Sequence, residues 1–229
     1  MDADVLAKIN LARTERRPIA LVTDLSGGGQ TLVEDAASLG DNGLRVEVEK
    51  RFKSGKSGVV TEGDQESFIQ VHVPSPRMVI IGAVHISQAL VPMARNCGFD
   101  VVVIDPRTAF ASQERFPGVE LIAEWPQEVL SERPLDAYSA LVAVTHDPKI
   151  DDMPLQAALK AGCFYVGALG SRKTHGKRAQ RFAEAGFDDA AMQPVHAPIG
   201  LDIGAASPAE IAVSVMAEVI QTLRKGPVT

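Results

Sequence analysis

The chain has 229 residues, enough for one large domain or for a large and a small one, and 45% of them are hydrophobic, which suffices to bury a core. The net charge is −6 with neutral histidines and only 5% of residues are aromatic, so neither a nucleic-acid partner nor an anionic membrane surface is expected. Cys97 and Cys163 show no CxxC pattern and no metal-ligand spacing, and we expect both to be small core residues. The chain shows no signal-peptide pattern and no apolar run of membrane-spanning length, so we expect a cytoplasmic protein.

The first 75 residues predict a small α+β domain. A helical apolar stripe covers residues 5–12. Strand-like segments follow at 19–25, 31–35, 44–52, 57–63 and 66–73, the last three because polar and apolar positions alternate. Two closely spaced prolines, Pro74 and Pro76, fit neither a strand nor a helix, so we place the boundary there, with domains at 1–75 and 76–229.

The rest of the chain alternates short apolar runs with helical patterns. Strands are predicted at 78–83, 100–105, 119–123, 140–146 and 163–169, and helices at 86–97, 152–161 and 172–185. Strands that are apolar on both faces indicate a parallel sheet covered by helices on both sides, so the fold class is α/β and Rossmann-like. Ser207, Pro208 and Glu210 form a capping box that begins a last helix.

The turn Gly82-Ala83-Val84-His85 joins the first strand of this domain to its first helix, and Asp105 ends the second strand. This arrangement is typical of a dinucleotide-binding βαβ unit, in which the helix N-terminus holds phosphate and the acid binds a ribose hydroxyl. Val84 conflicts with it, because the fingerprint has glycine there to let the backbone approach the pyrophosphate. The residues leave two interpretations open: a dinucleotide site, or a fold that keeps the turn without that function.

Further polar residues follow the other strands. Ligands of open parallel sheets bind outside the carboxyl ends of the strands, where this sequence places Arg107, Thr145, His146, Asp147, Gly170, Ser171, Arg172 and Lys173. Free backbone N–H groups, a hydroxyl and two cations at the start of the helix after Gly170 favour an anion. These loops together predict a phosphorylated or otherwise anionic ligand. The sequence offers no convincing nucleophile and no metal-ligand cluster, so we assign no catalytic residue and no metal site.

Several segments resemble the XdhC/CoxI family over roughly residues 74–225: VIIGAVHIS, VAVTHDPKID, YVGALGSRK, HAPIGLDIGA and SPAEIA. Members of that family are accessory factors in the maturation of xanthine dehydrogenase and related molybdenum hydroxylases. The resemblance implies that the chain binds molybdenum cofactor (molybdopterin) as cargo, protects it during sulfuration and passes it to the apo-hydroxylase, with a cysteine desulfurase as a further partner. It also implies binding roles for Gly82, Asp105, Arg107, His146, Gly170, Ser171 and Arg172.

The chain departs from the family pattern at two places. Family members have glycine where this chain has Val84, and longer members carry an N-terminal SGGCVE element where this chain has Gly29 and no cysteine. Two alternatives therefore stay open beside a maturation chaperone. One is an NAD(P)-dependent oxidoreductase, which Val84 disfavours, and the other is a nucleotide-sensing or scaffolding module. We expect a homodimer, for which the last helix offers an apolar face, although the same face suits a core.

Overall fold

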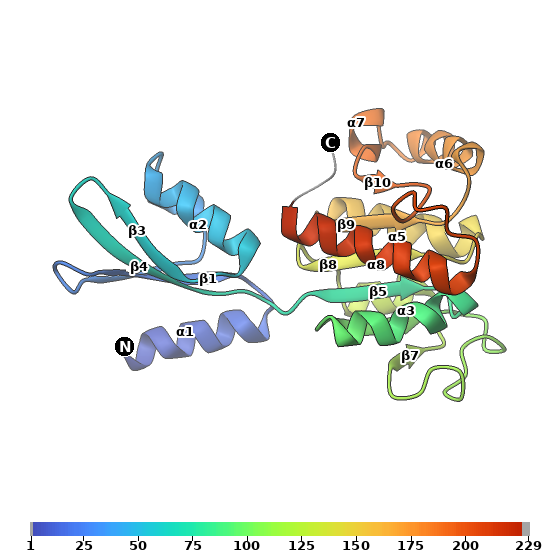
Figure 1. Cartoon of the computed structure of the whole chain (residues 1–229), viewed down its shortest axis with the longest axis horizontal. Helices are drawn as coiled ribbons and strands as arrows, with labels where there is room; N and C mark the ends of the chain where they lie inside the picture. Colours follow the sequence, from blue (N-terminus) through green and yellow to red (C-terminus); the bar gives the residue numbers. More distant parts are fainter. Residues whose placement is uncertain (1, 226–229) are drawn as a thin grey trace. The chain divides into compact units, whose positions relative to one another are not determined.

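The structure, a computed structural model, describes residues 2–225, and the chain divides between Pro74 and Ser75 into two compact units (Figure 1). The elements of the first unit are α1 (Ala3–Thr14), β1 (Ile19–Asp24), β2 (Gln30–Val33), the 3-10 turn η1 (Ala36–Leu39), α2 (Gly43–Ser54), β3 (Gly58–Glu62) and β4 (Gln65–His72). Its four strands form an antiparallel sheet of order β2-β1-β4-β3. Alternate residues of β1 pack against α2 on one face and α1 on the other, so the sheet lies between two helices.

The strand predicted at 44–52 is wrong, because these residues belong to helix α2. The Asn42 side chain accepts a hydrogen bond from the Arg45 N–H (2.9 Å), and Gly55 ends the helix in the left-handed conformation. Val48 is buried in the small core, whereas Val46 is 60% exposed. Leu44, Val48 and Phe52, which pack in this core, therefore lie four positions apart, as expected for a helix. The exposed Val46 between them made the segment resemble a strand with alternating apolar residues.

The second unit confirms the predicted Rossmann-like fold. Its elements are β5 (Arg77–Ile81), α3 (His85–Asn96), β6 (Asp100–Ile104), β7 (Glu120–Ile122), α4 (Pro126–Glu132), β8 (Ser139–Ala143), α5 (Pro148–Lys160), β9 (Tyr165–Ala168), α6 (Arg172–Glu184), α7 (Asp189–Met192), β10 (Val195–His196) and α8 (Pro208–Lys225). Six strands form a parallel sheet of order β10-β9-β8-β5-β6-β7. Numbered within the unit, this order is 6-5-4-1-2-3, the arrangement of dinucleotide-binding folds, whose strand order reverses between β5 and β8.

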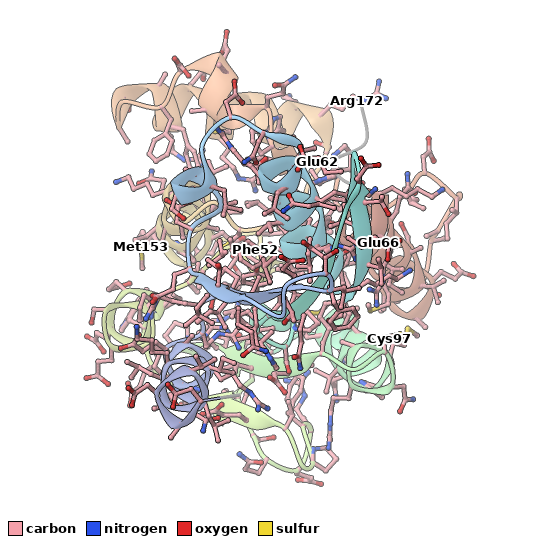
Figure 2. The ribbon with its side chains drawn as sticks, turned by 90° about the vertical axis from the view of Figure 1, so that its left-hand side faces the viewer. Phe52, Glu62, Glu66, Cys97, Met153 and Arg172 are labelled. Carbon is pink, nitrogen blue, oxygen red and sulfur yellow. The ribbon has the colours of Figure 1, made fainter. Side chains whose placement is uncertain are left out.

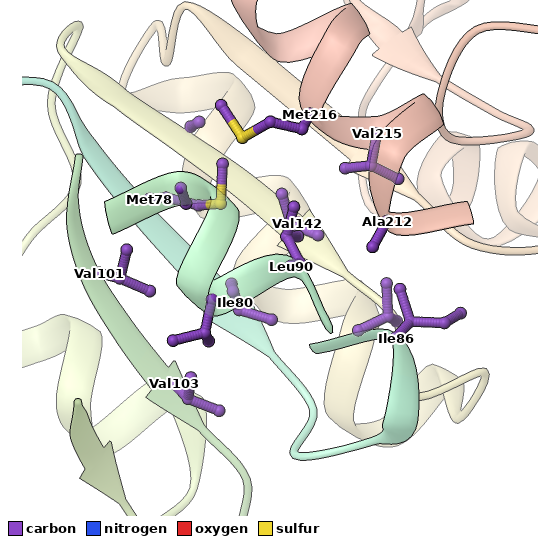
Figure 3. Close-up of a cluster of buried hydrophobic side chains, with 14 of the residues drawn as sticks. Met78, Ile80, Ile86, Leu90, Val101, Val103, Val142, Ala212, Val215 and Met216 are labelled. Carbon is purple, nitrogen blue, oxygen red and sulfur yellow. The ribbon is translucent and has the colours of Figure 1, made fainter. Parts of the chain in front are cut away.

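Two apolar cores cover the faces of this sheet. Met78 and Ile80 face α3 and α8, which lie on the same side of the sheet, and Figure 3 shows their side chains with those of Leu90 and Val215. The next residues along each strand face α4, α5 and α6 instead. The continuous apolar runs that predicted buried strands thus reflect a sheet with helices on both faces.

The last helix packs into the core as well. The Ser207 Oγ accepts from the Glu210 N–H (3.3 Å), and the Glu210 carboxylate accepts from the Ser207 N–H (2.8 Å), so the capping box is formed as predicted. Val215 and Val219 are fully buried in the larger core. The apolar face of the last helix was one candidate for a dimer interface, but these two of its valines pack inside the unit as core residues. Within residues 2–225, no helix has both the length and the apolar character that crossing a membrane requires.

Candidate functional site

The strand-order reversal brings Gly82 and Thr145 together at the carboxyl edge of the sheet. Gly82 follows β5 with φ +117°, a conformation that side-chain-bearing residues rarely adopt. A Cβ at this position would lie 2.8 Å from Thr145 Cγ2, which follows β8. Glycine is therefore required both by the backbone conformation and by the close approach of the neighbouring loop.

The turn from β5 into α3 is held by its neighbours. The Ser87 Oγ donates to the Gly82 carbonyl (2.5 Å), and Arg115 Nη1 donates to the Ala83 carbonyl (2.9 Å). Val84 has extended backbone angles and packs against the larger core, so a side chain fits there without strain. His85 is exposed and begins the helix, whose N-cap has no side-chain hydrogen bond. The N-terminus of α3 therefore has no side-chain cap, and uncapped helix N-termini favour anions in general.

Asp105 and Arg107 form a hydrogen-bonded ion pair beside this turn. The Asp105 carboxylate has no exposed area, and its Oδ2 accepts from the Ala83 N–H (2.7 Å) and from Arg107 Nη2 (2.8 Å). Burial by itself would raise the pKa of Asp105, but hydrogen bonds from Arg107 and Ala83 bring it below the ordinary value. The hydrogen bond to Asp105 and the charges of Asp151 and Asp147 raise the pKa of Arg107, so the loops after β6 and β8 are within electrostatic reach of each other.

The loop after β8 contains Thr145, His146 and Asp147. Asp147 is the N-cap of α5 and accepts from the Lys149 N–H (3.0 Å), and Thr145 Oγ1 donates to Asp151 Oδ1 (2.7 Å). His146 is exposed, with a left-handed φ of +64°. Among the described residues, no hydrogen bond joins His146 to Asp147, so a proton relay between them has no geometric support.

The turn after β9 leads into α6. Gly170 has φ +133°, and Ser171 caps the helix by accepting from the Thr174 N–H (3.3 Å). Arg172 and Lys173 are exposed, and the Arg172 side chain extends away from the ribbon (Figure 2). In the described part of the chain, no hydrogen bond or ion pair joins residues 170–173 to the other three loops. These residues therefore lie at the same sheet edge as those loops, with no polar link to them among residues 2–225.

Three residues near these loops were not identified as candidate site residues from the sequence. Arg115 ties its own loop to the α3 turn, Asp151 is 1% exposed and Arg178 is 3% exposed. Arg178 Nη2 donates to the Leu169 carbonyl (3.2 Å), whereas its Nε and Nη1 and the Asp151 Oδ2 are buried without a hydrogen-bond partner among the described residues. Nothing in their local sequence marks them, because only the fold brings α5 and α6 to this edge.

A second polar network connects the last helix to the sheet. Glu218 accepts hydrogen bonds from the Tyr165 hydroxyl (2.6 Å) and the Gly200 N–H (2.8 Å), and His196 Nδ1 lies 3.0 Å from its other oxygen. The rings of Tyr165 and His196 stack with centroids 4.6 Å apart. Burial opposes ionisation of Glu218, but its bonds to His196 and Tyr165 lower its pKa overall. The network joins β9, β10 and α8 in the core.

The two cysteines lie outside the candidate site. Cys97 caps the C-terminus of α3 and is exposed, so the prediction that it is a core residue is wrong (Figure 2). Cys163 is partly buried, and burial raises the pKa of its thiol to about 12, which disfavours the nucleophilic thiolate. Across residues 2–225, no group of three or more His, Cys, Asp or Glu side chains could hold a metal ion.

A family model described as the XdhC Rossmann domain matches residues 78–219, a span that contains every loop of the candidate site. A Bacillus subtilis protein named as a probable xanthine dehydrogenase subunit is 35% identical over 159 residues, which are 69% of this chain and 46% of that protein. An Escherichia coli protein named molybdenum cofactor insertion chaperone PaoD is 31% identical over 146 residues, 64% of this chain and 40% of that protein.

Another Escherichia coli protein, YqeB, is 28% identical over 212 residues, 88% of this chain and 38% of that protein. The chain thus spans less than half the length of these curated relatives. A crystal structure described as a xanthine dehydrogenase from Bacillus halodurans superimposes with a TM-score of 0.68 at 25% identity, covering 96% of this chain and 67% of that one. With its Rossmann domain matched over residues 78–219, the chain belongs to the XdhC family.

Proposed function

We propose that this protein binds molybdenum cofactor at the carboxyl edge of its parallel sheet and assists its insertion into a molybdenum hydroxylase of the xanthine dehydrogenase type. The observation that carries the proposal is the family match over residues 78–219, since these residues also build the whole candidate site. A relative that is 31% identical over 146 aligned residues is named as a molybdenum cofactor insertion chaperone.

The chemistry of the edge supports an anionic cargo. Molybdenum cofactor is a pterin dithiolene that carries a phosphate, and the edge offers the open N-terminus of α3 together with Arg107, Arg172 and Lys173. Both cysteine thiols lie outside the site. The protein would therefore hold the cofactor while a separate enzyme, a cysteine desulfurase, supplies the sulfur.

An NAD(P)-dependent oxidoreductase is the less supported function. The strand order suits a dinucleotide, but the carboxylate of Asp105 that would bind a ribose is already occupied by Arg107 and Ala83. Val84 also keeps its side chain at the position where a pyrophosphate would approach the backbone.

Reconstitution of an apo-hydroxylase tests the proposal. Purified protein and molybdenum cofactor released from a donor enzyme are added to the apo-hydroxylase, and xanthine oxidation is followed. We expect more activity with the protein than with an equal amount of albumin. Arg172→Ala should lower this gain, and Arg133→Ala, which removes an exposed arginine paired with Glu120 away from the site, should not. Equal activity with protein and albumin would refute the proposal.

A further inference from the structure

Buried polar atoms without a hydrogen bond gather on the first two turns of α5 and α6. Among residues 2–225, five buried side-chain nitrogen or oxygen atoms have no hydrogen-bond partner, and four of them belong to Asp151, Arg178 and His175. These four are Asp151 Oδ2, Arg178 Nε, Arg178 Nη1 and His175 Nδ1, whereas the fifth, Arg51 Nε, lies in the first unit. Native proteins leave few such atoms, so a cluster of them at one sheet edge indicates a site that a ligand completes.

Asp151 and Arg178 are neighbours that two different loops hold. Thr145 Oγ1, after β8, donates to Asp151 Oδ1 (2.7 Å), and Arg178 Nη2 donates to the Leu169 carbonyl after β9 (3.2 Å). The charge of Arg178 lowers the pKa of Asp151, and the charge of Asp151 raises the pKa of Arg178, so the two side chains are within electrostatic reach. In the described part of the chain, however, no ion pair joins them.

The free atoms of this cluster carry opposite charges. Burial raises the pKa of Asp151 to about 6, so its carboxylate is ionised near neutral pH. Arg178 Nε lies 3.9 Å from Asp152, which already accepts two hydrogen bonds from Arg181 (2.5 and 3.0 Å). Burial and the charge of Arg178 lower the pKa of His175, so this imidazole adds no charge. The cluster therefore offers the N–H donors of a cation beside the acceptor oxygen of an anion.

This combination fits a group that both donates and accepts. A fully ionised phosphate has only acceptors, so it would leave Asp151 Oδ2 without a partner and would be repelled by its charge. A cyclic amide edge, in which a carbonyl oxygen lies beside N–H groups, satisfies both side chains. Of the chemical parts of molybdenum cofactor, only the pterin ring carries such an edge, with its 4-oxo and 2-amino groups.

The backbone next to the cluster supports a ligand site. His146, which follows Thr145, has a left-handed φ of +64°, and strained backbone of this kind concentrates at ligand sites. Asp151 and Arg178 are 1% and 3% exposed, so a ligand reaches them only when the loops that hold them open. Both loops contain exposed residues, among them His146 and Ser171.

We propose that Asp151 and Arg178 bind the 2-amino-4-oxopyrimidine edge of the pterin ring. Arg178 donates to the 4-oxo group, and Asp151 Oδ2 accepts from the 2-amino group. Guanine has the same edge, so a guanine nucleotide is the other source of this chemistry. The proposal rests on the proposed function, which supplies the pterin, and it names the residues that recognise the ring.

Fluorescence titration with pterin and lumazine tests the proposal. Lumazine has a carbonyl oxygen in place of the 2-amino group of pterin, and both compounds keep the 4-oxo group. The wild type should bind pterin at least about tenfold more tightly than lumazine, because lumazine turns an acceptor toward Asp151 Oδ2. Guanosine, measured by competition, should bind more weakly than pterin. Tighter binding of guanosine would assign the edge to a guanine nucleotide and overturn the assignment to pterin.

Asp151→Asn should reverse this preference. Asparagine keeps an oxygen for Thr145 but presents N–H donors where Oδ2 was. Pterin should therefore bind about tenfold to a hundredfold more weakly than to the wild type, and lumazine should bind this variant more tightly than pterin does. A structural role of Asp151 would instead lower both affinities together. Asp100→Asn is the matched control, since Asp100 is exposed at the start of β6, on the opposite edge of the sheet, and it should keep the wild-type preference.

Arg178→Lys should weaken pterin and lumazine by a similar factor of about ten, because both present the 4-oxo group. Arg133→Lys changes an exposed arginine paired with Glu120 and should leave both affinities unchanged. Asp151→Asn tests the proposal independently if Arg178→Lys fails to fold.

The proposal is overturned if the wild type does not bind pterin, if it binds lumazine equally well, or if Asp151→Asn keeps the wild-type preference. Hydroxylase reconstitution separates these outcomes from a failure of the proposed function. Reconstitution by a protein in which Asp151→Asn leaves the preference unchanged refutes the proposal about the ring edge alone. The expected reversal without any reconstitution refutes the proposed function alone.

Discussion

Replacing Asp151 by asparagine should change how stability depends on pH. The Asp151 carboxyl is 1% exposed, and its Oδ1 accepts from Thr145 Oγ1 (2.7 Å), while its Oδ2 is buried without a partner among the described residues. Burial raises the pKa from 3.8 to about 6, although the bonds to Thr145 and the charge of Arg178 act in the opposite direction. The ionised form is therefore unfavourable in the folded protein.

The sign follows from proton linkage. The folded state holds this proton more tightly than the unfolded state, so protonation of Asp151 stabilises the folded protein. This stabilisation is complete below pH 3.8 and is lost as the pH rises through about 6. The shift from 3.8 to about 6 corresponds to about 3 kcal/mol once Asp151 is ionised in both states. Asparagine keeps an oxygen for Thr145 and does not titrate. The stability of Asp151→Asn relative to the wild type should thus grow by about 2 kcal/mol between pH 4 and pH 7.5.

Urea unfolding at pH 4, 5.5 and 7.5 measures this difference. The single tryptophan, Trp125, lies in the unit that contains Asp151, so its fluorescence reports the unfolding of that unit. Asp202→Asn is the matched control, since Asp202 is exposed, and its difference from the wild type should stay nearly constant with pH. A difference for Asp151→Asn that is equally independent of pH would refute the reasoning about burial.

Three further substitutions test other parts of the structure. Gly82→Ala should destabilise the protein by about 1–3 kcal/mol, because alanine must adopt a positive φ and its Cβ must approach Thr145. Chemical unfolding measures this loss of stability, and an unchanged midpoint would contradict the close approach of Gly82 to Thr145. Glu218→Gln should cost about 2–3 kcal/mol in unfolding experiments, since the charged partner of His196 is lost, and a cost near zero would mean that the network does not stabilise the core. Arg172→Ala should weaken pyrophosphate binding by about 1.5–3 kcal/mol in calorimetry without changing the melting temperature, and unchanged affinity would remove this exposed residue from the site.

The parallel sheet could be predicted because its strands are buried on both faces and read as continuous apolar runs. The short elements α4, α7 and β10 could not be predicted, because they have between two and seven residues, too few to show a helical or strand-like periodicity of apolar residues. Helix α2 was misread because Val46 created an alternation between Leu44 and Val48. Its capping residues, Asn42 and Gly55, were the signal that could have corrected this.

The site was predictable as a set of strand ends, because the carboxyl ends of parallel strands meet at one edge. The hydrogen-bond and ion-pair partners of each side chain could not be predicted in this way. Asp105 was matched to a ribose-binding acid by its spacing from Gly82, and only the structure shows Arg107 filling its carboxylate. Arg178 lies on α6, far along the chain from the loop after β8, and meets this edge only in three dimensions. Asp151 is one turn into α5, but its burial and its hydrogen bond to Thr145 are visible only in the structure.

Mass spectrometry of the small molecules released from the purified protein tests cofactor binding most directly. The protein is expressed in molybdate-fed cells, denatured after purification, and the released compounds are compared with those from the Arg107→Ala and Arg133→Ala variants. A phosphorylated pterin that accompanies the wild type and Arg133→Ala, but is depleted in Arg107→Ala, is the predicted result. A nicotinamide dinucleotide in its place, or a wild-type protein that releases no pterin, would contradict it.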